Sequence, residues 1–282
     1  MLQSNQEGQN SSILIREVWA SNLAYEFYLI RGVVGRYPFI SMDTEFPGVI
    51  HSPQVDAPNP SRRRQLHPID CYRYLKANVD DLKLIQVGLT LTDADGNLPQ
   101  FGTNQGYIWQ FNFCDFDPAR DHHNPDSIDL LRRQGIDFNS NISHGIDSVH
   151  FGEMLMNSGL VLNKAVTWVT FHSAYDFGYL VKILTRQNLP DRLEDFLYVL
   201  RMFFGDNVYD IKHMIRFCNA LYGGLERVAS TLNVDRAVGK SHQAGSDSLL
   251  TWHAFQRMMN VYFVDSEAHQ HAGVLFGLEM TV

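Results

Sequence analysis

The stretch FISMDTEFPG, residues 39–48, decides the fold of this chain. Its apolar first half predicts a buried strand. The proline and glycine that follow end the strand, because proline cannot donate to a sheet ladder and glycine permits a sharp turn. Asp43 and Glu45 are two positions apart, so both side chains project from the same face of this strand.

Two acids in an apolar strand need a partner. Burying an ionised carboxylate without one costs several kcal/mol, so the pair favours a bound cation. Hard oxygen ligands with no cysteine nearby suit Mg²⁺ or Mn²⁺. Taken alone, the motif also fits an edge strand with a solvated acidic face.

The segments on either side of this strand predict a tail, a helix and a loop. Residues 1–12 are polar and predict a disordered tail. An amphipathic helix follows and ends at Tyr37-Pro38; its apolar face carries Leu23, Phe27, Ile30 and Val34. After the strand, residues 51–68 contain four prolines and the basic run Arg62–Arg64, a composition that predicts a solvated loop insertion.

The remaining pattern predicts strands first and alternating helices and strands later. Residues 82–91 and 107–113 predict an antiparallel hairpin around the turn at 93–97. Glycines end two predicted helices, at 126–134 and 146–157. Further strands are expected at 166–171 and 208–211, and further helices at 174–187, 193–204, 225–232 and up to Met258. The fold class is therefore α/β, a mixed sheet covered by helices.

Asp176 is a further candidate. It lies in FHSAYDFGYL, where an apolar strand turns into a helix, so it faces the same edge of the sheet as the end of the first strand. Ser173 followed three residues later by Asp176 is also a capping-box pattern. Taken alone, this motif therefore favours a helix cap.

Asp247 and His242 lie in HQAGSDSLLT, at the start of the last long helix. At about 100° per residue the two could not share one helix face, so His242 must precede the helix, where the chain can fold it back over Asp247. The alternative is an exposed histidine and a first-turn acid that is favoured by the helix dipole.

The three motifs together indicate a metal site more specifically than any one of them does alone. Four carboxylates can hold two divalent ions about 3.5–4 Å apart, which activate water on one side of a phosphodiester and stabilise the leaving oxygen on the other. Histidine exchanges protons near neutral pH, so His242 is the predicted base for the attacking water. The predicted site comprises Asp43, Glu45, Asp176, His242 and Asp247.

Composition limits the kind of protein this is. The formal net charge of −8 argues against binding nucleic acid through many phosphate contacts. The cysteines Cys71, Cys114 and Cys218 are widely spaced, which predicts free thiols in a reducing compartment. There is no secretory signal pattern and no long apolar run, so we expect a soluble intracellular protein with no membrane partner. Residues 13–282 are expected to form one domain.

The segments MDTEFPG, FHSAYDFGYL and HQAGSDSLLT resemble the three exonuclease motifs of the DEDD nucleases, with a histidine in the third. With IQVGLTL, WQFNF and the helix at 225–232, the chain resembles the CCR-associated-factor deadenylases of the Caf and Pop type, and plant members most. These are the small nuclease subunits of the CCR-NOT complex. The resemblance covers about residues 13 to 279.

The resemblance implies an RNase H-like DEDD exonuclease fold and stepwise 3′→5′ release of 5′-AMP from single-stranded poly(A) RNA. It implies a catalytic subunit that works beside a scaffold and a second deadenylase, in the cytoplasm, including P-bodies, and in the nucleus. It also implies that His242 is the base and that two Mg²⁺ or Mn²⁺ ions are bound by Asp43, Glu45, Asp176 and Asp247. Ala174, Trp252 and the long insertion depart from the family pattern without touching these residues.

Three other features carry two interpretations each. The run Arg62–Arg64 either guides phosphates or is only solvated, and the pair His122-His123 fits a surface loop better than a metal site. Asp210 is either an extra ligand or the cap of the following helix.

Two other functions also stay open. The same four acids and histidine serve exonucleases that act on DNA or on other RNA, and adenine preference comes only from the family, since platforms such as Phe46 or Tyr175 stack on any base. A non-catalytic scaffold subunit is the second alternative. It is disfavoured because a decayed site would be expected to have lost an acid.

Overall fold

The computed structural model describes residues 12–53, 66–264 and 267–279. A mixed six-stranded sheet lies at its centre, in the order β1-β4-β3-β2-β5-β6. β2 runs antiparallel to β3 and parallel to β5, so the carboxyl ends of β2 and β5 point to the same edge of the sheet. The strands are β1 (Ile13–Val18), β2 (Phe39–Glu45), β3 (Gln86–Thr92), β4 (Gly106–Asn112), β5 (Thr167–Thr170) and β6 (Val208–Asp210).

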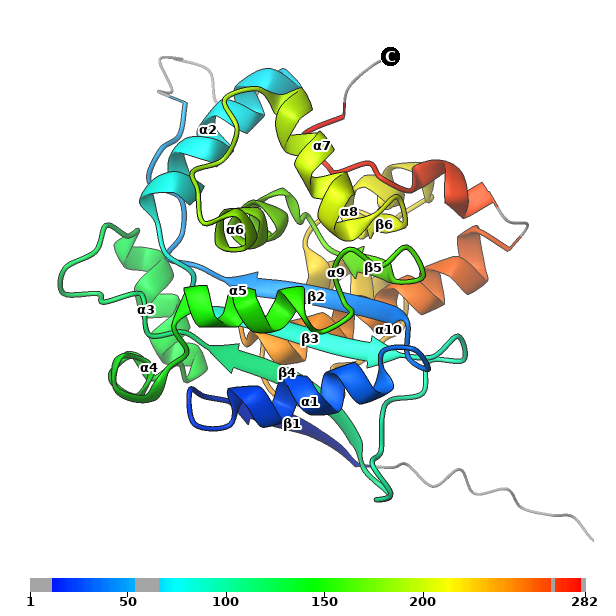
Figure 1. Ribbon diagram of the computed structural model, residues 1–282. Helices are drawn as coiled ribbons and strands as arrows, with labels where there is room; N and C mark the ends of the chain where they lie inside the picture. Colours follow the sequence, from blue (N-terminus) through cyan, green and yellow to red (C-terminus); the bar gives the residue numbers. More distant parts are fainter. Residues whose placement is uncertain (1–11, 54–65, 265–266, 280–282) are drawn as a thin grey trace, which may run out of the picture.

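Helices cover both faces of the sheet. Figure 1 shows α1, α5 and α6 on one face and α10 on the other. The helices are α1 (Leu23–Val33), α2 (Pro68–Asp81), α3 (Pro125–Gln134), α4 (Phe138–His144), α5 (Ser148–Met156), α6 (Ala174–Thr185), α7 (Leu193–Phe204), α8 (Ile211–Met214), α9 (Leu225–Thr231) and α10 (Ala244–Tyr262), with short 3₁₀ turns at Ile215–Phe217 and Glu267–His271. None of the helices in the described ranges is long and apolar enough to cross a membrane.

An aromatic cluster joins the first face to the sheet. The ring of Phe27 on α1 lies 5.3 Å from that of Phe111 on β4 and 5.6 Å from that of Phe151 on α5. Phe113, directly after β4, completes the cluster, with its ring 5.0 Å from that of Phe151. All four side chains are buried. Their burial explains the apolar spacing of the predicted first helix, which the structure confirms.

The predicted α/β class and hairpin are confirmed. β3 and β4 pair antiparallel, with Gln86 opposite Asn112. The predicted first strand of the hairpin starts four residues too early, because β3 begins at Gln86 and residues 82–85 are the segment that leads into it. Gly135 and Gly159 follow α3 and α5 with φ of 104° and 81°, the left-handed conformation that glycine adopts without strain.

Three elements, β1, α2 and α4, are not predicted by the sequence pattern. β1 is only six residues long, too short for its alternation to be distinguished from the start of a helix. α2 begins at Pro68, which counts as a loop signal in the sequence; proline nevertheless fits the first helical position, where no N–H bond is needed. The predicted tail and most of the predicted insertion, with Arg62–Arg64, fall on residues 1–11 and 54–65, outside the described ranges.

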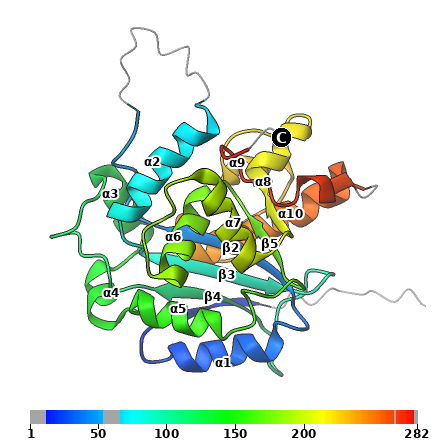
Figure 2. The same cartoon turned by 45° about the horizontal axis from the view of Figure 1, so that its top comes forward.

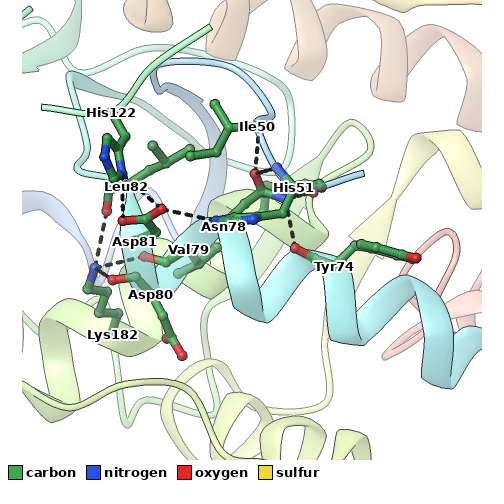
Figure 3. A network of polar contacts seen from close by, with 11 residues as sticks. Ile50, His51, Tyr74, Asn78, Val79, Asp80, Asp81, Leu82, His122 and Lys182 are labelled. Carbon is green, nitrogen blue, oxygen red and sulfur yellow. Dashed lines mark hydrogen bonds and ion pairs between the residues drawn. The ribbon is translucent and has the colours of Figure 1, made fainter. Parts of the chain in front are cut away.

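α2 fixes the loop that leaves β2. It packs beside α6 in both views (Figures 1 and 2). The side-chain oxygen of Asn78 accepts the N–H groups of Ile50 and His51 at 2.8 and 2.9 Å (Figure 3). Lys182 of α6 donates to three backbone carbonyls at the C-terminal end of α2. The turn that follows Glu45 is therefore tied to two helices.

α10 approaches β3 closely enough to exclude a side chain. A Cβ on Gly88 would lie 1.8 Å from the carbonyl oxygen of Ala244, the first residue of α10. Two hydroxyl contacts continue this interface: Ser41 Oγ donates to the Ser248 carbonyl, and Thr90 Oγ1 lies 2.8 Å from Ser248 Oγ. Small and hydroxylated residues therefore set the position of the helix that carries Asp247.

We expect Gly88→Ala to destabilise the protein by at least about 2 kcal/mol, because overpacking here must displace backbone and not a flexible side chain. Gly32→Ala is the matched control. Gly32 lies inside α1 with open space around its Cβ position, so alanine there should stabilise by about 0.5–1 kcal/mol. Urea unfolding of both variants measures the difference, and equal midpoints would contradict the close approach of α10.

Candidate active site

The five predicted site residues come from three elements and the loop before α10, and they meet at one edge of the sheet. Asp43 and Glu45 lie on β2, whose last residue is Glu45. Asp176 lies in the first turn of α6, and Asp247 lies in the first turn of α10. A cavity of about 330 Å³ opens here, and its lining includes Asp43, Glu45, Phe46, Leu131, Phe171, His242 and Asp247.

Asp176 is held by β2 and does not cap its own helix. Its Oδ1 accepts a 2.8 Å hydrogen bond from Thr44 Oγ1, and both side chains are buried. Ser173 makes no side-chain cap bond; its Oγ accepts from Thr170 Oγ1 at 2.6 Å. The capping-box interpretation of this segment is therefore wrong. Thr44 was not singled out in the sequence, although its place between the two acids of β2 points its side chain to the opposite face, toward α6.

His242 precedes α10 and folds back over Asp247, as the helical geometry requires. Its φ is 59°, and its backbone N–H donates to Asp247 Oδ2 at 2.9 Å. Its ring Nδ1 lies 3.9 Å from Glu45 Oε1, while 46% of its side chain remains exposed. One ligand atom each from Glu45, His242 and Asp247 lie within 4.8 Å of one another, close enough to hold one cation.

Arg236 is a cation of the site that the sequence did not reveal. Its Nη2 lies 2.6 Å from Asp247 Oδ1, and the same guanidinium pairs with Glu226 of α9. Only 16% of its side chain is exposed. Nothing in the sequence marks Arg236, because the loop that carries it reaches Asp247 only through the packing of α9 against α10.

Burial, together with the charges of neighbouring carboxylates, raises the pKa values of the acids in this cluster. Desolvation, followed by the charges of Asp247 and Asp176, raises the pKa of both Asp43 and Glu45 well above their ordinary values. Desolvation also raises the pKa of Asp176 from 3.8 to about 7, against the opposing hydrogen bond from Thr44. One arginine does not balance four acids. The donor set therefore fits divalent cations, which oxygen ligands favour.

Asp210 is a structural anchor, and the predicted cap is confirmed. Its buried carboxylate accepts the backbone N–H of Lys212 at the start of α8. It also accepts the N–H groups of His172, Ser173 and Phe276, at 2.7, 3.3 and 3.0 Å. These bonds fix the turn between β5 and α6, one turn of helix before Asp176.

Two further sets of residues singled out in the sequence are the pair His122-His123 and the aromatic residues Phe46 and Tyr175. His122 is exposed, as expected of a surface loop, but it has an acid partner that the sequence did not suggest: Nδ1 lies 3.2 Å from Asp81, which also contacts His51 (Figure 3). Phe46 and Tyr175 stack on each other, with centroids 5.2 Å apart and planes at 15°.

Comparisons with known proteins agree with this architecture. Residues 18–151 match the CAF1 family ribonuclease model. An *Arabidopsis thaliana* protein, probable CCR4-associated factor 1 homolog 10, is 52% identical over 96% of this chain and 94% of its own length. The poly(A) ribonuclease pop2 of *Schizosaccharomyces pombe* is 43% identical over 95% of this chain and 76% of its own.

Solved structures give the same result. The *S. pombe* Pop2p structure in its Mg²⁺- and Mn²⁺-bound form superposes with a TM-score of 0.82 at 42% identity, covering 94% of this chain and 99% of that one. A yeast CAF1 crystallised with the NOT1 MIF4G domain gives 0.73 at 33% identity, covering 93% and 96%. The fold is thus that of the RNase H-like DEDD nucleases. More closely, the chain belongs to the CAF1 ribonuclease family.

The raised pKa values predict how stability depends on pH in the absence of metal. A carboxyl whose native pKa exceeds its unfolded value binds protons more tightly when folded, so its contribution to stability falls as pH rises. For Asp176 the window runs from 3.8 to about 7. In EDTA, we expect wild type to lose melting temperature relative to Asp176→Asn between pH 5 and pH 8. Parallel curves for the two proteins would contradict the raised pKa.

Proposed function

We propose that this chain is a poly(A)-specific 3′→5′ exoribonuclease that releases 5′-AMP with the help of two divalent ions, Mg²⁺ or Mn²⁺. One observation carries the proposal: Asp43, Glu45, Asp247 and His242 line one cavity, and Asp176 is bonded to Thr44 beside them, in a chain of the CAF1 ribonuclease family. We further propose a single nuclease domain over residues 13–282, with a tail at 1–12 and an insertion at 51–68.

The proposed metal ligands are the four acids. Their crowding in a desolvated cavity is the condition that divalent cations relieve, and the Mg²⁺- and Mn²⁺-bound form of Pop2p supports this assignment. When bound, two such ions would activate the attacking water and stabilise the leaving oxygen. The ligands are Asp43, Glu45, Asp176 and Asp247, and Thr44 and Arg236 hold two of them in place.

His242 is the proposed base. Its ring is half exposed at the mouth of the cavity, so it can pass a proton to solvent after taking one from the attacking water. The backbone bond from His242 to Asp247 keeps the ring beside Glu45 and leaves both ring nitrogens available for proton transfer. In this scheme the four acids hold the metal ions, Thr44 and Arg236 orient two of those acids, and only His242 takes the proton from the attacking water.

The acidic net charge supports a role inside a larger assembly. A protein of charge −8 has little long-range attraction for RNA, so a partner that delivers the tail makes physical sense. Yeast CAF1 crystallises with NOT1, which supports the proposal that this chain joins a CCR4-NOT complex with a scaffold and a second deadenylase. The three free cysteines fit a cytoplasmic, P-body and nuclear location.

The test measures the digestion of labelled oligo(A) with different 3′ ends. Oligo(U) and single-stranded DNA are compared with it as alternative substrates. We expect Mg²⁺-dependent shortening of oligo(A) from a free 3′ hydroxyl and none from a 3′-phosphate end. Asp43→Asn should be inactive yet no less stable than wild type in EDTA, because it removes one of the crowded charges. Cleavage of circular RNA, or equal rates on DNA, would instead support the alternative nucleases.

His242→Ala should slow oligo(A) digestion by about 10²–10⁴ without abolishing it, since the loss of a general base leaves the metal site in place. His172→Ala is the comparison, because His172 also follows a strand that ends at the site, but its ring packs on Phe276 and its backbone N–H donates to Asp210, which is not one of the four site acids. Single-turnover rates at saturating Mg²⁺ measure the effect. A His242→Ala rate equal to that of wild type would remove His242 as the base.

A further inference from the structure

A chain of buried side-chain amides crosses the sheet from β1 to α10. Gln110 and Asn112 of β4 donate to the carboxylate of Glu17 on β1, at 3.0 and 2.8 Å. Asn112 in turn accepts from Gln86 of β3 at 2.7 Å. The three amides are at most 4% exposed, whereas Glu17 faces solvent. Strand pairing puts all four side chains on the face that α10 covers.

Glu17 sets the direction of the hydrogen bonds along this row of amides. An amide group can present either its oxygen or its nitrogen, but an ionised carboxylate only accepts hydrogen bonds. Glu17 therefore forces Gln110 and Asn112 to turn their nitrogens toward it. Their oxygens must then face away, that of Asn112 toward Gln86 and that of Gln110 toward α10.

The far end of this row of amides holds the first turn of α10. Gln110 Oε1 accepts the N–H of Gly245 at 3.0 Å, and Gln86 Oε1 accepts that of Ala244 at 3.4 Å. The N-cap residue Gln243 makes no side-chain cap bond, so the sheet supplies the acceptors that a helix start requires. Asp247 follows Gly245 by two residues in the same turn.

We propose that Glu17 is a positioning residue for the active site: through Gln110 it orients the first turn of α10 and hence the carboxylate of Asp247. The inference rests on the proposed function of Asp247 as a metal ligand. Groups that orient ligands typically change metal affinity or activity by about 10–100-fold when they are removed. Glu17 thus acts on the site from the edge strand of the sheet without touching the ligands.

The experiment compares Glu17→Met, Glu17→Gln and the control Glu194→Met in the full chain. Methionine keeps the length of the side chain and removes the acceptor; glutamine keeps one acceptor oxygen. Glu194 is an exposed acid on α7, remote from the amide chain. Mn²⁺ titration calorimetry measures affinity, and oligo(A) kinetics measure kcat and KM separately.

We expect Glu17→Met to weaken Mn²⁺ binding by about 10-fold and to lower kcat with KM unchanged, with Glu17→Gln in between. The proposal is overturned if Glu17→Met binds Mn²⁺ like Glu194→Met, or if it loses only melting temperature. Gln110→Met should match Glu17→Met in Mn²⁺ affinity; wild-type affinity in that variant would also overturn it. A wild type that binds Mn²⁺ but leaves oligo(A) intact would contradict the proposed function and not this inference.

Discussion

Mutual repulsion among buried carboxylates is the constraint on which the rest of this structure depends. Desolvation, followed by the charges of Asp247 and Asp176, raises the pKa of Asp43 and Glu45. Such an arrangement costs folding free energy, so the surrounding fold must hold the side chains in place. The same crowding would favour divalent cations at the proposed metal site, because a cation relieves the repulsion only when the chain is folded.

The fold meets this constraint by fixing the acids through contacts from several elements. Thr44 of β2 bonds Asp176, so the strand that carries two of the acids also orients the third. Arg236 and the His242 backbone hold the two oxygens of Asp247. Asp210 fixes the turn before α6, and Gly88 allows α10 to lie directly on β3. The carboxylates of Asp176 and Asp247 are thus held in place by neighbours from other parts of the fold.

Family membership and geometry bear on different questions. The relatives identify a CAF1 ribonuclease, and the fold agrees with theirs over nearly the whole chain. The crowded acids explain why such a protein would need bound metal ions. They also explain why replacing one acid with a neutral side chain would leave the fold no less stable in the absence of metal. Adenine preference comes from the family and not from the geometry, since the rings of Phe46 and Tyr175 stack on each other and such rings accept any base.

The sequence by itself determined the α/β class, the hairpin, and the four acids with His242, because these depend on local periodicity and on motif spacing. It also required His242 to precede α10, which is a matter of helical geometry. Only the tertiary structure decided that Asp176 bonds Thr44 and does not cap its helix, and that Arg236 reaches Asp247. It likewise revealed β1, whose Glu17 joins the amide chain. These contacts link residues far apart in the chain, and no local pattern records them.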